Sequence, residues 1–320
     1  MRIRKGINTM SLDRLIEKIE QTQNPTVAGL DPKLDYVPEY IKEKCFDKYG
    51  ETLKGAAKAL LEFNKALIDA LYDIVPAVKP QAAYYEMYGP AGVKTLYKTQ
   101  EYARSKGMYV ITDGKRNDIG TTMEAYAAAH LGKVKVGSEE FEPFLSDALT
   151  VNGYLGSDGI KPLLNICREN DKGIFVLVKT SNPSSGELQD RLIDGMPIYE
   201  VMGHMCENWG RELPGVYGYS GVGAVVGATY PAMLTELREK LPTTFFLIPG
   251  YGAQGAGAKD IAGAFDKNGL GGIVNSSRGI MCAYQKEKCD ERQFAEAARR
   301  EAIRMRDDIM AVVGKISLNK

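Results

Sequence analysis

The sequence predicts a (β/α)8 barrel, the TIM-barrel architecture, in which eight parallel strands alternate with helices. Short apolar runs recur eight times, and longer stretches with apolar residues at helical spacing lie between them. The rival arrangement is an open doubly wound sheet, but its glycine fingerprint is missing after the first run, which ends Gly29-Leu30-Asp31-Pro32. A barrel takes about 250 residues. We therefore expect a single domain over residues 1–320, extended by an N-terminal helix and a C-terminal helix around residues 291–313.

The expected strands are continuous apolar runs rich in β-branched residues, as in parallel strands that are buried on both faces. Among the helices between them, residues 91–107 end at Gly107, which suits a C-cap, and Pro231 suits the first turn of another. Residues 33–56 and 183–212 are expected as inserts, the second being either a mobile lid or a surface excursion. The expected strand ranges are 26–31, 74–81, 108–113, 148–152, 173–180, 222–227, 244–250 and 271–276.

Composition and charge restrict the classes of function. Lysine plus arginine and aspartate plus glutamate number 41 each, so no bulk field draws the protein to nucleic acid or to an anionic membrane. Five cysteines without a C-x-x-C pair, together with two histidines, disfavour a zinc site and a disulfide framework. No stretch approaches the roughly 20 apolar residues of a membrane span, and an amphipathic stretch stands where a signal peptide would need an apolar run. We expect a cytoplasmic protein.

Polar side chains end six of the expected strands. In a barrel the active site lies at the carboxyl ends of the strands, so such residues indicate where the chemistry occurs. A single charged residue at a strand end can be a solvated boundary, whereas six strands that end this way indicate a functional cleft. The residues are Asp31, Lys79, Asp113, Asn152, Lys179 with Thr180, and Asn275.

Two glycine-rich loops follow the last two expected strands. They are PGYGAQGAGAKD (residues 249–260) and NSSRGI (residues 275–280). Glycine lets backbone N–H groups approach an anion closely, and barrels frequently bind phosphate at these two loops. Arg278 follows the last strand, where its guanidinium could clamp phosphate oxygens. The loops can also be simple tight turns, but their position together with the arginine predicts a phosphate site.

Four charged residues come together in the segment Asp113-Gly114-Lys115-Arg116-Asn117-Asp118. Asp113 and Lys115 are two positions apart, so an extended backbone would point both side chains to the same side. Asp118 lies near the start of the next helix, and Lys79 ends the neighbouring strand. Buried charges are tolerated when they are paired, and two lysines with two aspartates sum to zero. The pattern fits either a catalytic cluster or a salt-bridge network that braces the mouth of the barrel.

These residues resemble the orotidine 5′-phosphate decarboxylase family, and the resemblance runs over most of the chain. The D-x-K-x-x-D signature of that family stands here as Asp113, Lys115 and Asp118, and its strand-two lysine stands as Lys79 in VKPQAAYYEMYG. Together with GLDP, VLVKTSNPSS and GYGAQG, these motifs are similar to the longer bacterial-type branch. The resemblance implies a homodimer with shared active sites that converts orotidine 5′-phosphate to uridine 5′-phosphate and carbon dioxide, the last step of de novo UMP synthesis, without a cofactor or a metal.

The resemblance also implies a role for each matching position. Lys115 would stabilise the carbanion that forms at pyrimidine C6 and then protonate it, while Asp113 would lie beside the substrate carboxylate. Lys79 would order the charges and touch the ribose, and Asp118 and Thr122 would reach into the partner subunit's pocket. The remaining contacts would be made to the ribose by Asp31, to the base by Ser181, to the base and the phosphate by Gln254, and to the phosphate by Arg278.

Three other functions fit parts of the pattern. A sugar-phosphate lyase of the same suprafamily would need a magnesium-binding carboxylate near the end of strand two, where Lys79 stands and would repel the ion. A Schiff-base aldolase could use Lys79, Lys115 or Lys179, but the carboxylates beside Lys115 keep an amine protonated and non-nucleophilic. A non-catalytic phosphate binder would keep the glycine loops and Arg278 without needing the four charged residues.

Overall fold

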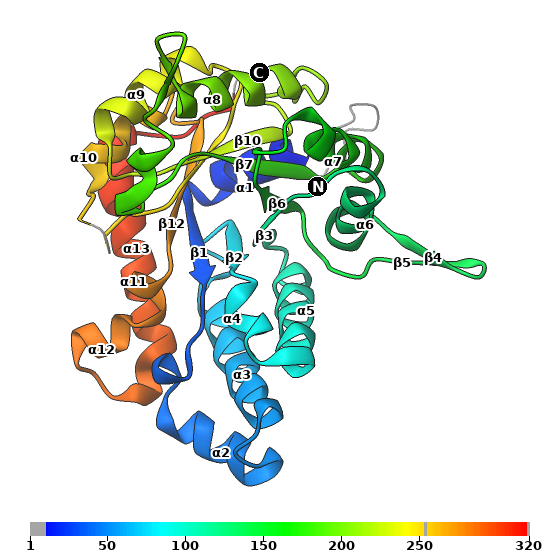
Figure 1. Cartoon of the computed structure of the whole chain (residues 1–320). Helices are drawn as coiled ribbons and strands as arrows, with labels where there is room; N and C mark the ends of the chain where they lie inside the picture. The colour runs from blue at the N-terminus through cyan, green and yellow to red at the C-terminus, as the bar shows by residue number, and fades with distance from the viewer. Residues whose placement is uncertain (1–10, 253–254, 319–320) are drawn as a thin grey trace.

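The computed structural model describes residues 11–252 and 255–318, and its centre is a closed barrel of eight parallel strands (Figure 1). The last strand pairs with the first and closes the ring. Each barrel strand overlaps one of the eight predicted runs, so the predicted (β/α)8 fold is confirmed. In order around the ring the strands are β1 (Thr26–Leu30), β2 (Ala77–Pro80), β3 (Tyr109–Arg116), β6 (Ala148–Val151), β7 (Gly173–Lys179), β10 (Val222–Val226), β11 (Phe246–Ile248) and β12 (Gly272–Ser276).

Helices connect the successive barrel strands. In the first half they are α2 (Glu39–Tyr49) and α3 (Leu53–Leu71) after β1, α4 (Ala83–Glu86) and α5 (Gly89–Ser105) after β2, α6 (Gly120–Leu131) after β3, and α7 (Ser157–Asn170) after β6. In the second half they are α8 (Ile198–Gly210) after β7, α9 (Pro231–Lys240) after β10, α10 (Ala258–Ile261) after β11, and α11 (Arg278–Met281), α12 (Ala283–Glu287) and α13 (Phe294–Val313) after β12. Short 3-10 turns occupy Leu34–Tyr36, Pro183–Glu187, Ala262–Ala264 and Glu291–Gln293.

Helix boundaries follow from local chemistry. The Thr52 side chain accepts a hydrogen bond from Gly55 N (3.1 Å) and so caps the first turn of α3. Pro231 starts α9, where a missing N–H removes no intrahelical bond. Beyond the end of α5, Gly107 has φ +78°, a left-handed conformation that costs glycine little. The predicted helix start at Pro231 is confirmed, whereas the C-cap residue of α5 is Lys106 and Gly107 lies one residue beyond it.

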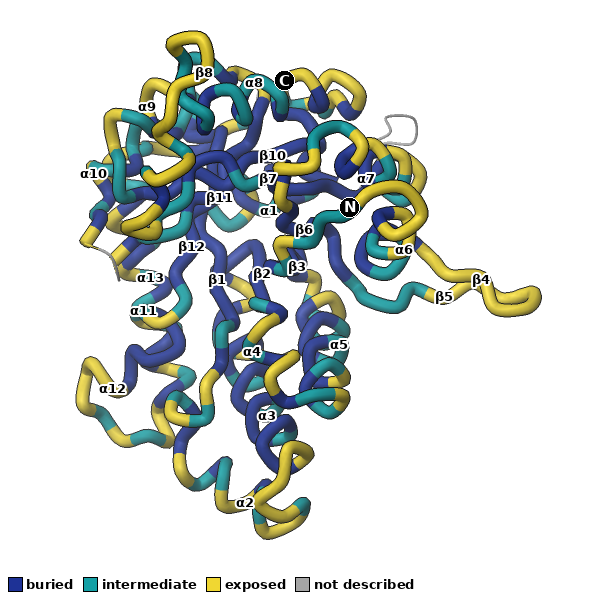
Figure 2. The backbone as a smooth tube through the Cα atoms, in the orientation of Figure 1, coloured by how far each residue is buried: buried dark blue, intermediate teal, exposed yellow. Residues whose placement is uncertain are grey.

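Helix α1 (Ser11–Thr22) closes the amino-terminal end of the barrel. Its Ser11 Oγ donates a hydrogen bond to Asp147 O (2.9 Å), just before the start of β6. Figure 2 shows the barrel strands in dark blue, which marks them as buried. This packing fills the amino-terminal end, so within residues 11–252 and 255–318 the barrel is open to a ligand at the carboxyl ends of the strands. The buried cluster that joins α1 to the barrel interior includes Leu12, Leu15, Ile16, Ile19, Val27, Phe175 and Phe245.

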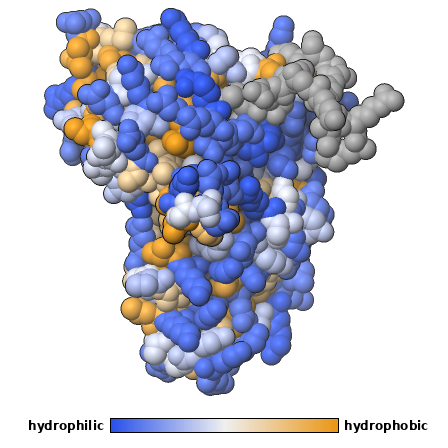
Figure 3. Space-filling view, turned by 90° about the vertical axis from the view of Figure 1, so that its right-hand side faces the viewer, coloured by the Kyte–Doolittle hydropathy of each residue, from blue (hydrophilic) through white to orange (hydrophobic). Residues whose placement is uncertain are grey.

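A hairpin of β4 (Val134–Val136) and β5 (Glu139–Phe141) follows α6 and projects from the body of the molecule (Figure 1). All the residues of its two strands are exposed. Figure 3 looks at the side that bears this hairpin, and polar side chains cover most of what it shows, with hydrophobic ones in small groups. The hairpin is therefore a surface excursion that leaves the barrel core unchanged.

The segment after β7 only partly matches the expected insert over residues 183–212. Residues 183–197 do form an excursion, which ends in the hairpin of β8 (Leu192–Ile193) and β9 (Met196–Pro197). Ile198–Gly210, however, form α8, which belongs to the regular helical layer, so the predicted insert was wrong there. Buried Cys206 and Trp209 pack α8 into the largest core cluster. The expected insert 33–56 contains α2 and the first residues of α3.

Three further findings bear on the predictions from composition. Within the described ranges, no helix is long and apolar enough to cross a membrane. The five cysteine thiols are free. Residues 11–252 and 255–318 contain no group of three or more histidine, cysteine, aspartate or glutamate side chains that could hold a metal ion.

Candidate active site

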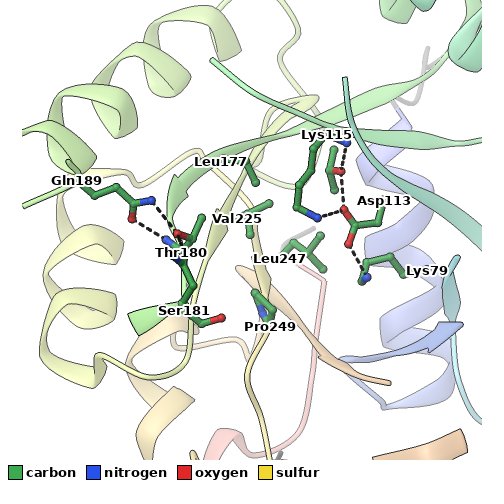
Figure 4. Close-up of a pocket in the computed structure, with 12 residues that line it drawn as sticks. Lys79, Asp113, Lys115, Leu177, Thr180, Ser181, Gln189, Val225, Leu247 and Pro249 are labelled. Atoms are coloured by element: carbon green, nitrogen blue, oxygen red, sulfur yellow. Dashed lines mark hydrogen bonds and ion pairs between the residues drawn. The ribbon is translucent and has the colours of Figure 1, made fainter. Parts of the chain in front are cut away.

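A chain of opposite charges lies at the carboxyl ends of β2 and β3 (Figure 4). At its centre, Asp113 accepts hydrogen bonds from Lys79 Nζ at Oδ2 (2.8 Å) and from Lys115 Nζ at Oδ1 (2.6 Å). The side chains of Lys79 and Asp113 are 5% and 11% exposed, whereas that of Lys115 is 46% exposed. The structure thus brings together three of the four predicted charged residues, as a buried pair with a more accessible lysine beside it.

Mutual attraction sets the charges of this cluster. Burial disfavours the charged form of Asp113, but the ammonium groups of Lys79 and Lys115 outweigh it and hold the pKa of this carboxyl well below its usual value. Burial also opposes the charge of Lys79, yet Asp113 and Asp31 raise the pKa of this amine. At neutral pH the buried pair is therefore an anion and a cation. A Schiff-base nucleophile must be a neutral amine, so Lys79 is unsuited to that role.

The backbone of β3 is not extended at Lys115, contrary to the extended backbone expected from the sequence. Lys115 has φ +48°, and the register between β3 and β6 shifts between Thr112 and Arg116. Several residues of β3 thus oppose a single residue of β6, Thr150, which is the arrangement of a β-bulge. Asp113 and Lys115 do meet, as predicted, but the assumed extended strand was wrong. The bulge, instead of regular strand alternation, turns the two side chains toward each other.

A cavity of about 470 Å³ opens beside the charged cluster. This volume lies within the range of small-molecule sites. Figure 4 shows apolar side chains in the middle of the cavity, the charged cluster on one side of them, and hydroxyl and amide groups on the other. A flat ligand could therefore rest on an apolar surface with charges at one edge and hydrogen-bonding groups at the opposite edge. The apolar residues are Leu177, Val225, Leu247 and Pro249, and the polar ones opposite include Thr180, Ser181, Asn182 and Gln189.

The polar side of the cavity is ordered by Gln189, a residue that no sequence pattern singles out. Its Oε1 accepts a hydrogen bond from Thr180 N (2.9 Å), and its Nε2 donates one to Thr180 Oγ1 (2.7 Å). Ser181, predicted to contact the base, lines the cavity next to this pair. Lys179 is not among the lining residues, although its strand-end position suggested a place in the cleft. Its buried ammonium pairs with Asp190 (2.5 Å) and so anchors the excursion after β7.

A second cavity, of about 390 Å³, adjoins the first, and Pro249 lines both. Arg278, predicted to bind phosphate, and Lys33 supply positive charge to its lining. Asp31 and Asn275 line it too, and the Oδ1 atom of each is buried without a hydrogen-bond partner among the described residues. Buried acceptors of this kind are normally paired, so they fit the donor groups of a ligand such as sugar hydroxyls. The second cavity therefore places two cationic side chains near two oxygen acceptors without partners among the described residues.

Two glycines lie at or next to the wall of this second cavity. A Cβ atom added to Gly29 would lie 1.9 Å from Ser277 Oγ and 2.9 Å from Asn275 Oδ1. The close approach of β1 to the loop after β12 thus excludes a side chain at position 29. In the loop after β11, Gly250 has φ +104°, which an L-residue rarely adopts. Gln254, predicted to contact the base and the phosphate, lies outside the described residues.

Asp118 and Thr122 do not join the charged cluster of their own chain. Asp118 Oδ1 accepts a hydrogen bond from Ile119 N (2.8 Å) beside the start of α6, and Thr122 is exposed on that helix. Neither residue lines the two cavities. Their predicted contact with a partner subunit's pocket stays a prediction.

The barrel and its two adjoining cavities define a class of protein, namely barrel enzymes that act on a small phosphorylated substrate at the carboxyl ends of the strands. The sequence model of the Orotidine 5'-phosphate decarboxylase / HUMPS family matches residues 51–291. The chain belongs to this family.

Individual relatives agree with the family match over nearly the whole chain. The orotidine 5'-phosphate decarboxylase of Rhodopirellula baltica is 43% identical over 295 residues, which cover 91% of this chain and 96% of that protein. The orotidine 5'-phosphate decarboxylase of Clostridium perfringens is 43% identical over 307 residues, which cover 96% of this chain and 100% of that protein. The structure of Leishmania donovani OMP decarboxylase is 30% identical, with a TM-score of 0.70 over 93% of this chain and 99% of that chain.

Sequence reasoning missed three residues that the structure brings to the site. Thr150, a neighbour of Asp113, lies inside an apolar run, and a lone polar residue in a buried strand is the signal that could have found it. Gln189 lies within the segment treated as an insert, where no periodicity marks single residues. Lys33 directly follows the GLDP motif, two positions after Asp31, and this position in the sequence is the signal that could have identified it.

Proposed function

We propose that this chain decarboxylates orotidine 5′-phosphate to uridine 5′-phosphate, the last step of de novo UMP synthesis. The observation that carries the proposal is the carboxylate of Asp113 held between two lysines at the edge of a cavity that adjoins an arginine site. The substrate has a flat ring with a carboxylate at C6, and the ribose joined to this ring carries a phosphate, which matches a charged cluster at one cavity and an arginine at the adjoining one. Membership of the family and the names of its relatives support the same activity.

In the proposed reaction, the bond between pyrimidine C6 and the carboxylate carbon breaks, and carbon dioxide leaves without the bonding electrons. The electron pair stays on C6 as a carbanion, which the fixed positive charge of Lys115 stabilises. Lys115 then transfers a proton from its ammonium group to C6, which yields the product and a neutral amine. Because its side chain is 46% exposed, Lys115 can regain a proton from solvent after the product leaves.

Asp113 and Lys79 form a fixed pair of charges that is already in place before the substrate binds. Both are buried and already paired, so their charges need little reorganisation during the reaction. Asp113 would lie beside the substrate carboxylate and repel it, whereas the product ring carries no charge at that position. Lys79 keeps Asp113 ionised through a contact of 2.8 Å.

Contacts remote from C6 supply binding energy that orients the reacting carbon. In the proposed complex Arg278 binds the phosphate, Asp31 the ribose hydroxyls, Ser181 the base, and Gln254 both the base and the phosphate. We further propose a cytoplasmic homodimer, in which Asp118 and Thr122 complete the partner subunit's pocket. Their placement outside the cavities of their own chain supports this arrangement.

An absorbance assay for the loss of orotidine 5′-phosphate tests the proposed activity. We expect the purified chain to be active, and Lys115→Ala to lower kcat by about 10⁴-fold or more because both charge stabilisation and proton transfer are lost. Lys135→Ala, on the exposed hairpin, is the matched lysine control and should behave as the wild type. An inactive wild-type protein or an unimpaired Lys115→Ala variant would contradict the proposal.

The same assay separates the proposal from a magnesium-dependent sugar-phosphate lyase. Lys79 is buried near the end of β2, and its ammonium would repel a cation in the region where that chemistry needs a metal-binding carboxylate. Activity is therefore expected to survive an excess of EDTA. Strict dependence on added magnesium would overturn the assignment.

A further inference from the structure

The bulge in β3 is bridged by a buried side chain of the neighbouring strand. Thr150, on β6, is 1% exposed and lies opposite the part of β3 where the strand register shifts. Its Oγ1 accepts a hydrogen bond from Lys115 N (3.0 Å) and donates one to Asp113 Oδ1 (2.8 Å). One hydroxyl group therefore joins the main chain of Lys115 to the side chain of Asp113.

Chemistry fixes the direction of both hydrogen bonds. A backbone N–H can only donate, so the N–H of Lys115 must use a lone pair of the Thr150 hydroxyl. An ionised carboxylate can only accept, so the hydroxyl proton points to Asp113. Because its acceptor is charged, the second bond belongs to the stronger class of hydrogen bonds. A side chain at position 150 that lacks a hydroxyl could make neither bond.

The backbone conformation of Lys115 is one that a hydrogen bond must stabilise. A residue with a side chain adopts φ +48° only at a cost, since its Cβ crowds the backbone in the left-handed region. In a regular ladder the N–H of Lys115 would pair with a backbone carbonyl, whereas here it pairs with the Thr150 hydroxyl. The hydroxyl therefore stabilises the bulged conformation, which sets the direction in which the Lys115 side chain leaves the backbone.

We propose that Thr150 is a positioning residue for the reaction, which holds the bulge so that the Lys115 ammonium faces the reacting carbon. The inference rests on the proposed decarboxylation. Before proton transfer, Asp113 Oδ1 accepts from two donors, Lys115 Nζ and Thr150 Oγ1. After transfer the lysine is a neutral amine and a weaker donor, but the bond from Thr150 remains. Thr150 thus keeps the Asp113 carboxylate in place while the charge beside it changes.

Three variants test the proposal. Thr150→Val keeps the shape of the side chain and removes the hydroxyl, and Thr150→Ser keeps the hydroxyl. Thr26→Val is the matched control, because Thr26 is equally buried on barrel strand β1 and its hydroxyl bonds to Asn24 Oδ1 (2.8 Å), outside the two cavities. We expect Thr150→Val to lower kcat by about 10- to 100-fold, the effect of a small misplacement of a reacting group, with KM changed less than about threefold. Thr150→Ser and Thr26→Val should keep kcat within about threefold of the wild type.

Rescue of kcat by Thr150→Ser, together with a loss of kcat at an almost unchanged KM in Thr150→Val, is the readout that a purely structural role would not give. A wild-type kcat in Thr150→Val, an equal loss in Thr26→Val, or a Thr150→Ser variant as impaired as Thr150→Val would each overturn the inference. If Thr150→Val does not fold, Thr150→Ala takes its place in the comparison with Thr150→Ser. Failure of the proposed function is distinguishable, because the wild type itself would then be inactive.

Discussion

Lys79 and Lys115 contact the same carboxylate, but their loss is expected to affect the stability of the fold very differently. The substitutions Lys79→Met and Lys115→Met remove the charge and replace lysine by another long, unbranched side chain. The Lys79 side chain is 5% exposed, and breaking a buried ion pair by removal of one partner costs about 3–5 kcal/mol. The Lys115 side chain is 46% exposed, so solvent screens its pairing and the expected cost is about 0–1 kcal/mol. Both variants should lose activity.

Urea unfolding followed by tryptophan fluorescence measures this difference. Trp209 is the single tryptophan of the sequence and is 6% exposed in α8, so its emission reports the loss of the core. Asp113→Asn in the Lys79→Met background is the control, because removing both charges of a buried pair costs less than the sum of the two single changes. Equal losses of unfolding free energy in Lys79→Met and Lys115→Met, or a fully stable Lys79→Met protein, would refute the reasoning from burial.

Three further outcomes are expected. Gly29→Ala should raise KM for orotidine 5′-phosphate at least tenfold, because the added Cβ would lie 1.9 Å from Ser277 Oγ at the second cavity; an unchanged KM in steady-state kinetics would contradict this. Arg278→Ala should raise KM by about 10²-fold, the size of a charge-assisted contact of about 2–3 kcal/mol, and Arg278→Lys should recover only part of it. His130 is buried, and burial followed by the charge of Arg116 lowers the pKa of the ring from 6.5 to about 4. Between these pH values the unfolded chain binds the proton and the folded chain does not, so stability should fall by about 3 kcal/mol from pH 6.5 to pH 4, and His130→Phe should flatten this slope in urea titrations at several pH values.

The architecture could be predicted because its signal is local. Parallel strands that are buried on both faces appear as continuous apolar runs, and all eight runs became barrel strands. The charged residues at the ends of β2 and β3 could be selected for the same reason, since a barrel brings the carboxyl ends of its strands to one rim. The proximity of Asp113 and Lys79 could therefore be predicted without any information about side-chain contacts, and the structure has the two side chains in contact.

The remaining features depend on contacts between segments that no local pattern encodes. The left-handed φ of Lys115 is adopted in a bulge that Thr150 stabilises from another strand, so the sequence around Lys115 alone suggests a regular strand. Lys179 ends a strand like Lys79 does, but a carboxylate in the next loop, Asp190, draws its ammonium away from the cavity. The sequence around α8 suggests an insert, because the excursion before this helix gives no signal for the residue at which the helix begins.

The closure of the barrel has a consequence for the way the protein folds. β1 pairs with β12, and Thr26 lies opposite Val274, about 250 positions away in the sequence. Contacts between such distant segments form slowly, because a long loop must close before they contribute any stability. Arg278 lies two residues after the end of β12, so it cannot take its place at the second cavity until the last strand has docked. During refolding, enzymatic activity should therefore return with the slowest phase, after most of the helical signal has recovered.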